Sequence, residues 1–151
     1  MSSDIQSTFI SAVVASTTAI SAAAGVANNA ALTLTASPYV TDAARKITIT
    51  CAGDDDAISF NIVGLDQLGN AATENLAGTD GGVSTSVGYW TSITSITAVG
   101  DPAGNVSAGT SNSVAAPIFG GRLRLLGLYA VNTGTAGTIT FRETSPTGSV
   151  R

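Results

Sequence analysis

The densest cluster of side chains that could do chemistry is the acidic run Asp54, Asp55 and Asp56. Carboxylate oxygens are the ligands that calcium prefers, so three of them within one turn raise the question of a metal site. However, adjacent side chains rarely converge on one ion, and no Asp-x-Asp-x-Asp-Gly pattern with a trailing Glu follows. The run therefore predicts a solvated turn and no metal site.

Glu74 and Glu143 are the only glutamates and the only other pair considered for acid–base chemistry. Two carboxyl groups about 5–10 Å apart can hydrolyse a glycosidic bond. Such enzymes usually hold sugars on aromatic side chains, and Tyr89 and Trp90 are the only local candidates. The stronger expectation is structural, with Glu74 on a strand face and Glu143 paired with a neighbour such as Arg142.

Nucleophilic and phosphate chemistry lack their usual residues. The chain contains no histidine, which excludes a histidine-based triad and a zinc site with histidine ligands. Cys51 is the only cysteine, it is in phase with Ile47 and Ile49, and no basic cluster would lower its pKa, so a buried structural thiol is expected. The glycines before Arg122 lack the Lys and Ser/Thr of a phosphate loop. We therefore predict no catalytic residue, no cofactor and no enzymatic activity.

Two kinds of side chain leave alternatives open. Tyr89 and Trp90 could anchor an interface, but in a chain this poor in aromatics they are slightly better explained as core residues. The basic pairs are Arg45–Lys46 and Arg122 with Arg124. They could meet an acidic partner surface, or they could be charges that block aggregation at a strand edge.

Composition limits the possible partners. The 151 residues (14.9 kDa) include only 11% charged side chains, with net charge −4 and a pI of about 4.3. An acidic chain does not favour nucleic-acid binding, and no stretch approaches the 20 apolar residues of a membrane span. Few charges are tolerable on a surface that is buried against other chains, so the composition suggests an assembly component.

The first 25 residues are rich in Ala, Ser and Thr and predict an N-terminal arm, residues 1–25. Ile5, Phe9 and Val13 recur every four residues, as on one face of a short helix, although the β-branched content argues against helix. The arm is expected to be extended or partly helical and ordered by contact with something else, or else to be a frayed tail. A secretory signal is not favoured, because Asp4 stands where positive charge belongs.

Residues 26–151 predict one all-β domain. Apolar and polar residues alternate, and short runs are separated by turns rich in Gly and Asp, as in a β-sandwich that is jelly-roll-like or Ig-like. Ile93 and Ile96 are three apart, so a bulge between them is expected. The segment 98–107 predicts a hairpin, residues 110–117 a loop, and residues 123–131 a central strand covered on both faces. The expected strand runs are residues 32–35, 47–51, 58–62, 83–87, 93–99, 106–109, 123–131 and 138–141.

Several of these segments together resemble a pattern found in small virion proteins of tailed bacteriophages. The resemblance covers about residues 20–110, begins with a lead-in at residues 30–34, and several turns keep their spacing. Its main parts are residues 45–55 (RKITITCAGDD), 58–70 (ISFNIVGLDQLGN), 74–78 (ENLAG), 93–97 (ITSIT) and 103–106 (AGNV).

The resemblance implies a structural role in the virion and carries over no catalytic residue. The expected function is that of a capsid cement or decoration protein, which is made in the host cytoplasm and located on the capsid surface. Its expected partners are the major capsid protein and further copies of itself, as a homotrimer, with no nucleic acid and no membrane. The alternatives are a tail, neck or adaptor component, or a glycan- or receptor-binding module that uses Tyr89, Trp90 and the turn at residues 54–56.

Overall fold

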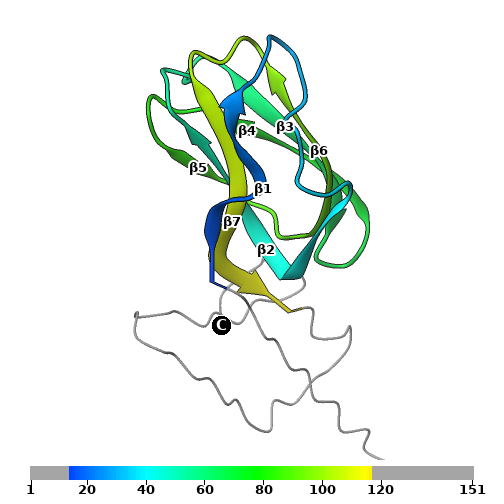
Figure 1. The fold of residues 1–151 in the computed structure, drawn as a ribbon. Helices are drawn as coiled ribbons and strands as arrows, with labels where there is room; N and C mark the ends of the chain where they lie inside the picture. The colour runs from blue at the N-terminus through cyan, green and yellow to red at the C-terminus, as the bar shows by residue number, and fades with distance from the viewer. Residues whose placement is uncertain (1–13, 117–151) are drawn as a thin grey trace, which may run out of the picture. The chain divides into compact units, whose positions relative to one another are not determined.

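The computed structural model describes residues 14–116, which form seven β-strands and no helix (Figure 1). All strand pairs are antiparallel, so the predicted all-β class is confirmed. The strands are Ser16–Gly25 (β1), Tyr39–Cys51 (β2), Ser59–Asp66 (β3), Ala71–Ala77 (β4), Val83–Thr85 (β5), Trp90–Val99 (β6) and Asn105–Ala115 (β7).

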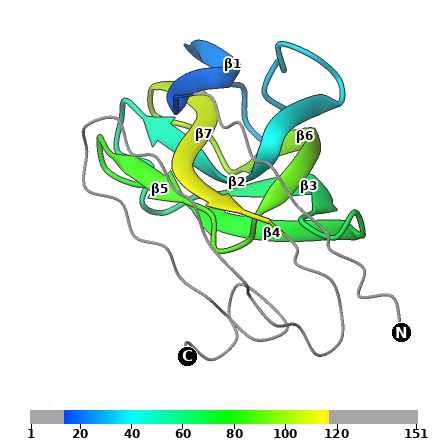
Figure 2. The same ribbon diagram turned by 90° about the horizontal axis from the view of Figure 1, so that it is seen from below.

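The sheet has the order β1-β7-β2-β6-β3-β4, and β2 belongs to both of its layers. The first half of β2 pairs with β6, whereas its second half pairs with β7 on one edge and β5 on the other. One layer therefore contains β1, β7, the end of β2, and β5, and the other contains β6, β3 and β4. Figure 2 shows β1 on the opposite side of the strands from β4. This arrangement is consistent with the predicted β-sandwich.

The core lies between the two layers and is filled mainly by isoleucine. Alternate residues of β3 and of the second half of β2, such as Ile47 and Ile49, point inward, which is the physical meaning of the alternation in the sequence. The buried cluster is built from Ile20, Leu32, Ile47, Ile49, Cys51, Phe60, Ile62, Trp90, Ile93, Ile96, Ala98, Val106 and Ala108.

A β-bulge in β6 keeps two isoleucines on the core face. Val63 of β3 pairs with Ser95 and the next residue, Gly64, pairs with Ile93, so Thr94 is an extra residue. Ile93 and Ile96 are consequently both buried, although a regular strand would point them to opposite faces. The predicted bulge is confirmed.

The structure corrects the predicted N-terminal arm. Residues 16–25 were assigned to the arm of residues 1–25, but they form β1, which pairs with β7. Between Ser16 and Ser21 the strand leaves the regular register, and Ile20 enters the core. One buried isoleucine in a run of small residues gives no period-two pattern, so the strand was not predicted. The helical spacing of Ile5, Phe9 and Val13 lies outside the described residues.

Two predicted connections are also corrected. Residues 98–107 do not form a hairpin, because β2 lies between β6 and β7 in the sheet. Residues 110–115 are not a loop but the end of β7, where polar side chains hide the strand pattern. Residues 32–35 form no strand, yet Leu32 donates its backbone N–H to the Ile96 carbonyl at 2.8 Å and is buried.

The chain divides into two units, Met1–Ala116 and Pro117–Arg151. The predicted domain of residues 26–151 extends over both of them. The strands expected at residues 123–131 and 138–141 lie outside the described residues.

Candidate functional site

The three consecutive aspartates have different environments. Asp54 and Asp56 are exposed, whereas Asp55 is only 1% exposed. Its Oδ1 accepts a hydrogen bond from the backbone N–H of Ala103 at 2.7 Å, which joins the β2–β3 connection to the β6–β7 connection. Asp55 is therefore a structural link, and the prediction of a solvated turn is wrong at this residue. Among residues 14–116, no three metal-ligating side chains lie close enough to hold an ion.

Removing the hydrogen bond between Asp55 and Ala103 is expected to destabilise the protein. Asp55→Ala removes a buried carboxylate and leaves the Ala103 N–H without its charged acceptor, and we expect the free energy of unfolding to fall by about 2 kcal/mol. Asp55→Asn keeps an acceptor oxygen and should lose less. Asp56→Ala is the matched control, with a change within about 0.5 kcal/mol. Urea denaturation measures all three, and equal losses in Asp55→Ala and Asp56→Ala would contradict the role given to Asp55.

Cys51 is buried, as predicted, and only 2% exposed. Burial is the largest effect and raises the pKa of its thiol above the ordinary value of 9.0. A hydrogen bond with the Thr79 backbone lowers this pKa, and the nearby Asp55 carboxylate raises it. A buried thiol with a raised pKa is a poor nucleophile. Cys51 is therefore a core residue at the end of β2.

The raised pKa makes stability depend on pH in the alkaline range. Above pH 9.0 the unfolded thiol ionises while the folded thiol keeps its proton, so unfolding releases a proton. The contribution of Cys51 is intact below its unfolded pKa, and it is lost as the pH rises through the folded value. Urea denaturation from pH 8 to 10.5 should show a smaller fall in stability for Cys51→Ala than for the wild type. Identical pH profiles would disprove this effect.

Glu74 holds a loop in place. Its two carboxylate oxygens accept hydrogen bonds from the backbone N–H groups of Val87 (2.6 Å) and Gly88 (3.0 Å). These bonds tie the middle of β4 to the connection between β5 and β6. The expected position on a strand face is correct, and Glu143 lies outside the described residues.

The aromatic pair separates into a core residue and a surface residue. Trp90 is buried in the core, which agrees with the slightly preferred interpretation. Tyr89 is half-buried, and the Nζ of Lys46 lies 5.5 Å from its ring centroid, a cation–π distance. A glycan site that used Trp90 as a platform is therefore excluded, because the indole is not accessible.

Arg45 has neither of the two roles that were considered for the Arg45–Lys46 pair. It is 1% exposed and lies on β2, which is not an edge strand. Its Nε and Nη2 donate to the two carboxylate oxygens of Asp42 at 2.6 and 2.8 Å, and its Nη1 donates to the Ser111 carbonyl at 2.8 Å. Residues three apart in a regular strand face opposite sides, but β2 has register shifts here, which allow the pair to form. Arg122 and Arg124 lie outside the described residues.

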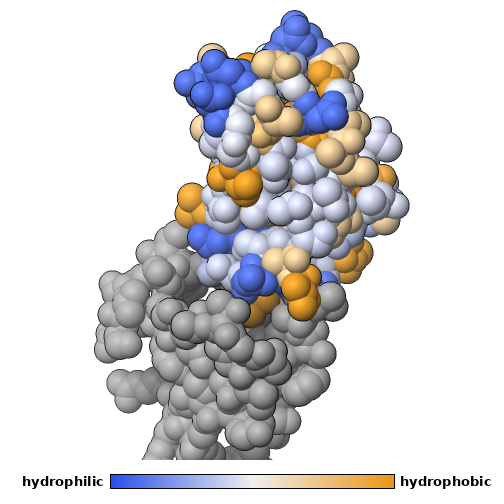
Figure 3. All heavy atoms as spheres, turned by 60° about the vertical axis from the view of Figure 1, so that its left-hand side comes forward, coloured by the Kyte–Doolittle hydropathy of each residue, from blue (hydrophilic) through white to orange (hydrophobic). Residues whose placement is uncertain are grey.

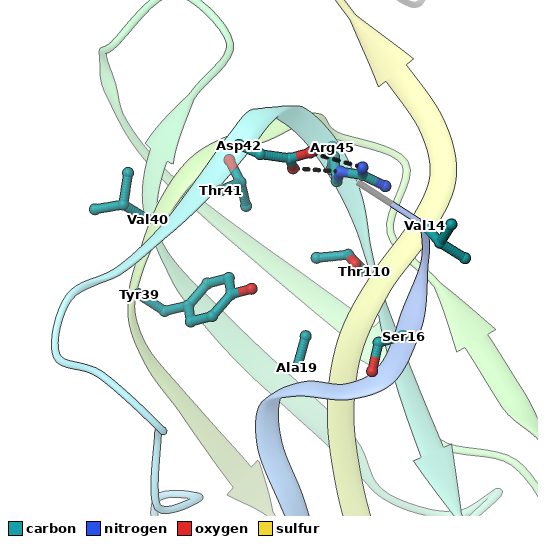
Figure 4. A pocket seen from close by; sticks show the side chains of 9 residues that line it. All are labelled: Val14, Ser16, Ala19, Tyr39, Val40, Thr41, Asp42, Arg45 and Thr110. Atoms are coloured by element: carbon teal, nitrogen blue, oxygen red, sulfur yellow. Dashed lines mark hydrogen bonds and ion pairs between the residues drawn. The ribbon is translucent and has the colours of Figure 1, made fainter. Parts of the chain in front are cut away.

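The Arg45–Asp42 pair forms one wall of a pocket of about 320 Å³ between β1, β2 and β7 (Figure 4). The ring of Tyr39 extends into the pocket from the start of β2, and Ser16, Ala19 and Thr110 lie on the side of β1 and β7. Val14, Val40 and Thr41 complete the lining. Sequence reasoning missed this pocket, because its residues come from three strands and share no motif. The only signal in the sequence was an aspartate, Asp42, three residues before Arg45. In a regular strand these two side chains would face opposite sides, so the spacing does not indicate an ion pair.

The segments that resemble the phage pattern have structural roles here. Asp66 Oδ1 accepts backbone N–H groups of Leu68 (2.8 Å) and Asn70 (2.9 Å) in the β3–β4 turn. Desolvation acts in the opposite direction, but hydrogen bonds from Asn70 and Leu68 lower the pKa of Asp66 below its usual value. Together with Arg45, Asp55 and Glu74, this residue stabilises connections of the sandwich and forms no common site.

Comparisons with known proteins supply no relative. No family model matches the chain, and neither the curated proteins nor the solved structures contain a match. The described residues include no helix long and apolar enough to cross a membrane.

Proposed function

We propose that this chain is a structural protein of a bacteriophage virion, a capsid cement or decoration protein that binds the major capsid protein and stabilises the shell. In this proposal it is made in the host cytoplasm, lies on the capsid surface, and associates with itself as a homotrimer. It acts by contact alone, with no catalysis, nucleic acid or membrane involved. The sequence resemblance over about residues 20–110 is the basis of the viral assignment.

The observation that carries a contact function is the outer edge of β4, which pairs with no further strand within residues 14–116. This strand pairs with β3 through seven consecutive residues without a bulge, and Glu74 is its only charged residue. The other strands that end a layer are less suitable for pairing, because β1 has two register shifts and β5 is three residues long. A regular, weakly charged edge presents unpaired backbone groups to a partner strand.

Two exposed valines flank this edge. Val83 on β5 is 52% exposed and Val87 after β5 is 62% exposed. The Ser84 hydroxyl of β5 donates to the Ala77 carbonyl of β4, and Glu74 of β4 accepts the backbone N–H of Val87 after β5. The edge and the valines therefore belong to one surface, called here the β4–β5 surface. Figure 3 turns the β5 side forward and shows mostly residues of intermediate hydropathy. Such a surface loses little hydration energy on contact.

A small contact energy becomes large when many copies of the protein make the same contact. Burial of apolar area stabilises by about 25 cal/mol per Å², so a few hundred Å² per copy contribute several kcal/mol before the cost of ordering. A contact of this size across a seam between capsid subunits becomes large when it is repeated over a shell. A rigid sandwich suits this task, because little conformational entropy remains to be lost on binding.

Stoichiometry in purified particles tests the proposal. We expect a copy number close to that of the major capsid protein. A ratio near one hundredth would instead indicate a neck, tail or adaptor component, and absence from the particles would refute a virion role. The oligomeric state of the purified chain, measured by sedimentation, tests the homotrimer separately.

Variants of the β4–β5 surface test its role directly. Val83→Ser combined with Val87→Ser should reduce binding of the added protein to particles that lack it. Val99→Ser is the matched control, since Val99 is 48% exposed at the end of β6, a strand that β3 separates from β4. Equal binding by the double variant and the control would rule out the β4–β5 surface as the contact.

A further inference from the structure

Besides the β4–β5 surface, the pocket between β1, β2 and β7 is a feature to which the preceding sections assign no role. The pocket and the β4–β5 surface lie at different parts of β2. The second half of β2 pairs with β5 through Thr48–Thr50. The pocket is lined by the first half of β2, from Tyr39 to Asp42, and by Arg45. Its volume of about 320 Å³ is at the small end of ligand sites in proteins. One small ring could occupy it, whereas a chain of several rings could not.

Among the described residues that line the pocket, the one positive and the one negative charge balance each other. The guanidinium of Arg45 and the carboxylate of Asp42 form a bidentate pair with donor–acceptor distances of 2.6 and 2.8 Å. Arg45 is additionally held by the Ser111 carbonyl, so the pair is fixed in position. A fixed, neutralised pair gives the wall a strong local dipole without attracting ions of either sign. The pocket therefore favours a polar ligand that carries no net charge.

Three hydroxyl groups line the remaining walls. Tyr39, Ser16 and Thr110 surround the cavity, and none of their hydroxyls donates a hydrogen bond to another residue of the described part of the chain. Thr41 differs, since its hydroxyl is used by the carbonyls of Trp90 and Thr91. A hydroxyl both donates and accepts, so a group of them is matched best by a ligand with several hydroxyls of its own.

The ring of Tyr39 and the valines at the mouth add apolar contact. Figure 4 shows the Tyr39 ring lying along one wall with its hydroxyl toward the β1 and β7 side, and Val14 and Val40 at the two edges. An aromatic face beside hydroxyl groups suits a molecule with C–H groups on one face and hydroxyls around its rim.

We infer that this pocket binds a neutral polyhydroxylated ring the size of one hexose. The site is separate from the buried Trp90 and from the turn at residues 54–56. It goes beyond the proposed virion function and does not depend on it, because binding is measured on the purified chain alone. A single shallow site with few hydrogen bonds predicts weak affinity, in the millimolar range.

Ligand-observed NMR on the full chain tests the inference. The probes are glucose, galactose, mannose and N-acetylglucosamine, each at millimolar concentration, and we expect saturation transfer to at least one of them. For the sugar that binds, Tyr39→Phe removes one hydroxyl while keeping the ring and should weaken the Kd about five-fold. Thr110→Val should weaken it by a similar factor, and Tyr39→Ala should abolish detectable transfer.

Tyr89→Phe is the matched control, because Tyr89 is also half-buried but lies beside Lys46 and outside the pocket. It should leave the Kd unchanged, and unchanged melting temperatures show that all variants are folded. Absence of transfer from every sugar would overturn the inference, as would equal Kd values for Tyr39→Phe and Tyr89→Phe. Displacement of the bound sugar by sodium sulfate at constant ionic strength would also overturn it, since it would indicate an anion site.

Discussion

Gly64→Ala is expected to lower the free energy of unfolding by about 3 kcal/mol or more, and Tm by roughly 10–20 °C. Gly64 is buried in β3, at the register shift where β3 meets the bulge in β6. A methyl group there would collide with the Ser92 carbonyl oxygen and would lie 3.1 Å from the Ile93 Cα. Both neighbours are backbone atoms of a central strand, so they cannot move without breaking the pairing of β3 with β6.

The matched control for Gly64 is Gly25→Ala at the exposed end of β1. A methyl group on Gly25 would meet only the Asn105 Oδ1, at 3.9 Å. We expect no loss, or a gain of up to about 1 kcal/mol from the stiffer unfolded chain. Thermal and urea denaturation of both variants give the comparison. A Gly64→Ala protein as stable as Gly25→Ala would show that the two strands are not packed as described.

Arg45→Met is expected to lower the free energy of unfolding by about 3 kcal/mol, an effect similar in size to that of Gly64→Ala. Methionine keeps an unbranched side chain of moderate length but removes the partner of Asp42 and the donor to the Ser111 carbonyl. Leaving a carboxylate beside the pocket without its guanidinium costs more than the pair contributes by itself. Arg45→Met/Asp42→Asn should therefore recover part of the loss, because the uncompensated charge is gone. The coupling is read from the double-mutant cycle.

Lys46→Met is the control for Arg45, since it changes the neighbouring cation on the same strand. Lys46 is half-buried, and its Nζ lies 5.5 Å from the centroid of the Tyr89 ring. Its loss should cost less than about 1 kcal/mol. If Arg45→Met and Lys46→Met lose the same stability, or if the double variant recovers nothing, the pair of buried Arg45 with Asp42 does not have the role given to it.

Interior strands were the part of the fold that could be predicted well. Ile47, Ile49 and Cys51, or Phe60 and Ile62, alternate with polar residues, and they are buried as the pattern requires. The bulge between Ile93 and Ile96 was also predictable, because only an extra residue places both on one face. The alternation of apolar and polar residues did not predict β1 or the end of β7, because small or polar residues predominate there.

The residues of the candidate sites, in contrast, could not be predicted from the sequence. Asp54, Asp55 and Asp56 look equivalent in the sequence, yet only Asp55 is buried, because only its carboxylate meets the Ala103 N–H. The pocket residues Tyr39 and Thr110 had no distinguishing motif at all. These residues form a pocket because β1, β2 and β7 lie side by side in the fold. The spacing of residues along the chain does not indicate which strands become neighbours.

By itself, the sequence determined that this chain is a β-protein with a core of alternating isoleucines, because period two places every second side chain on one face. Composition also determined which chemistry is impossible, since a chain without histidine has no histidine site. Only the tertiary structure decided the strand order, the sharing of β2 between two layers, the burial of Arg45 and Asp55, and the pocket. These features depend on contacts between residues far apart in the chain, and such contacts follow from the packing of whole strands.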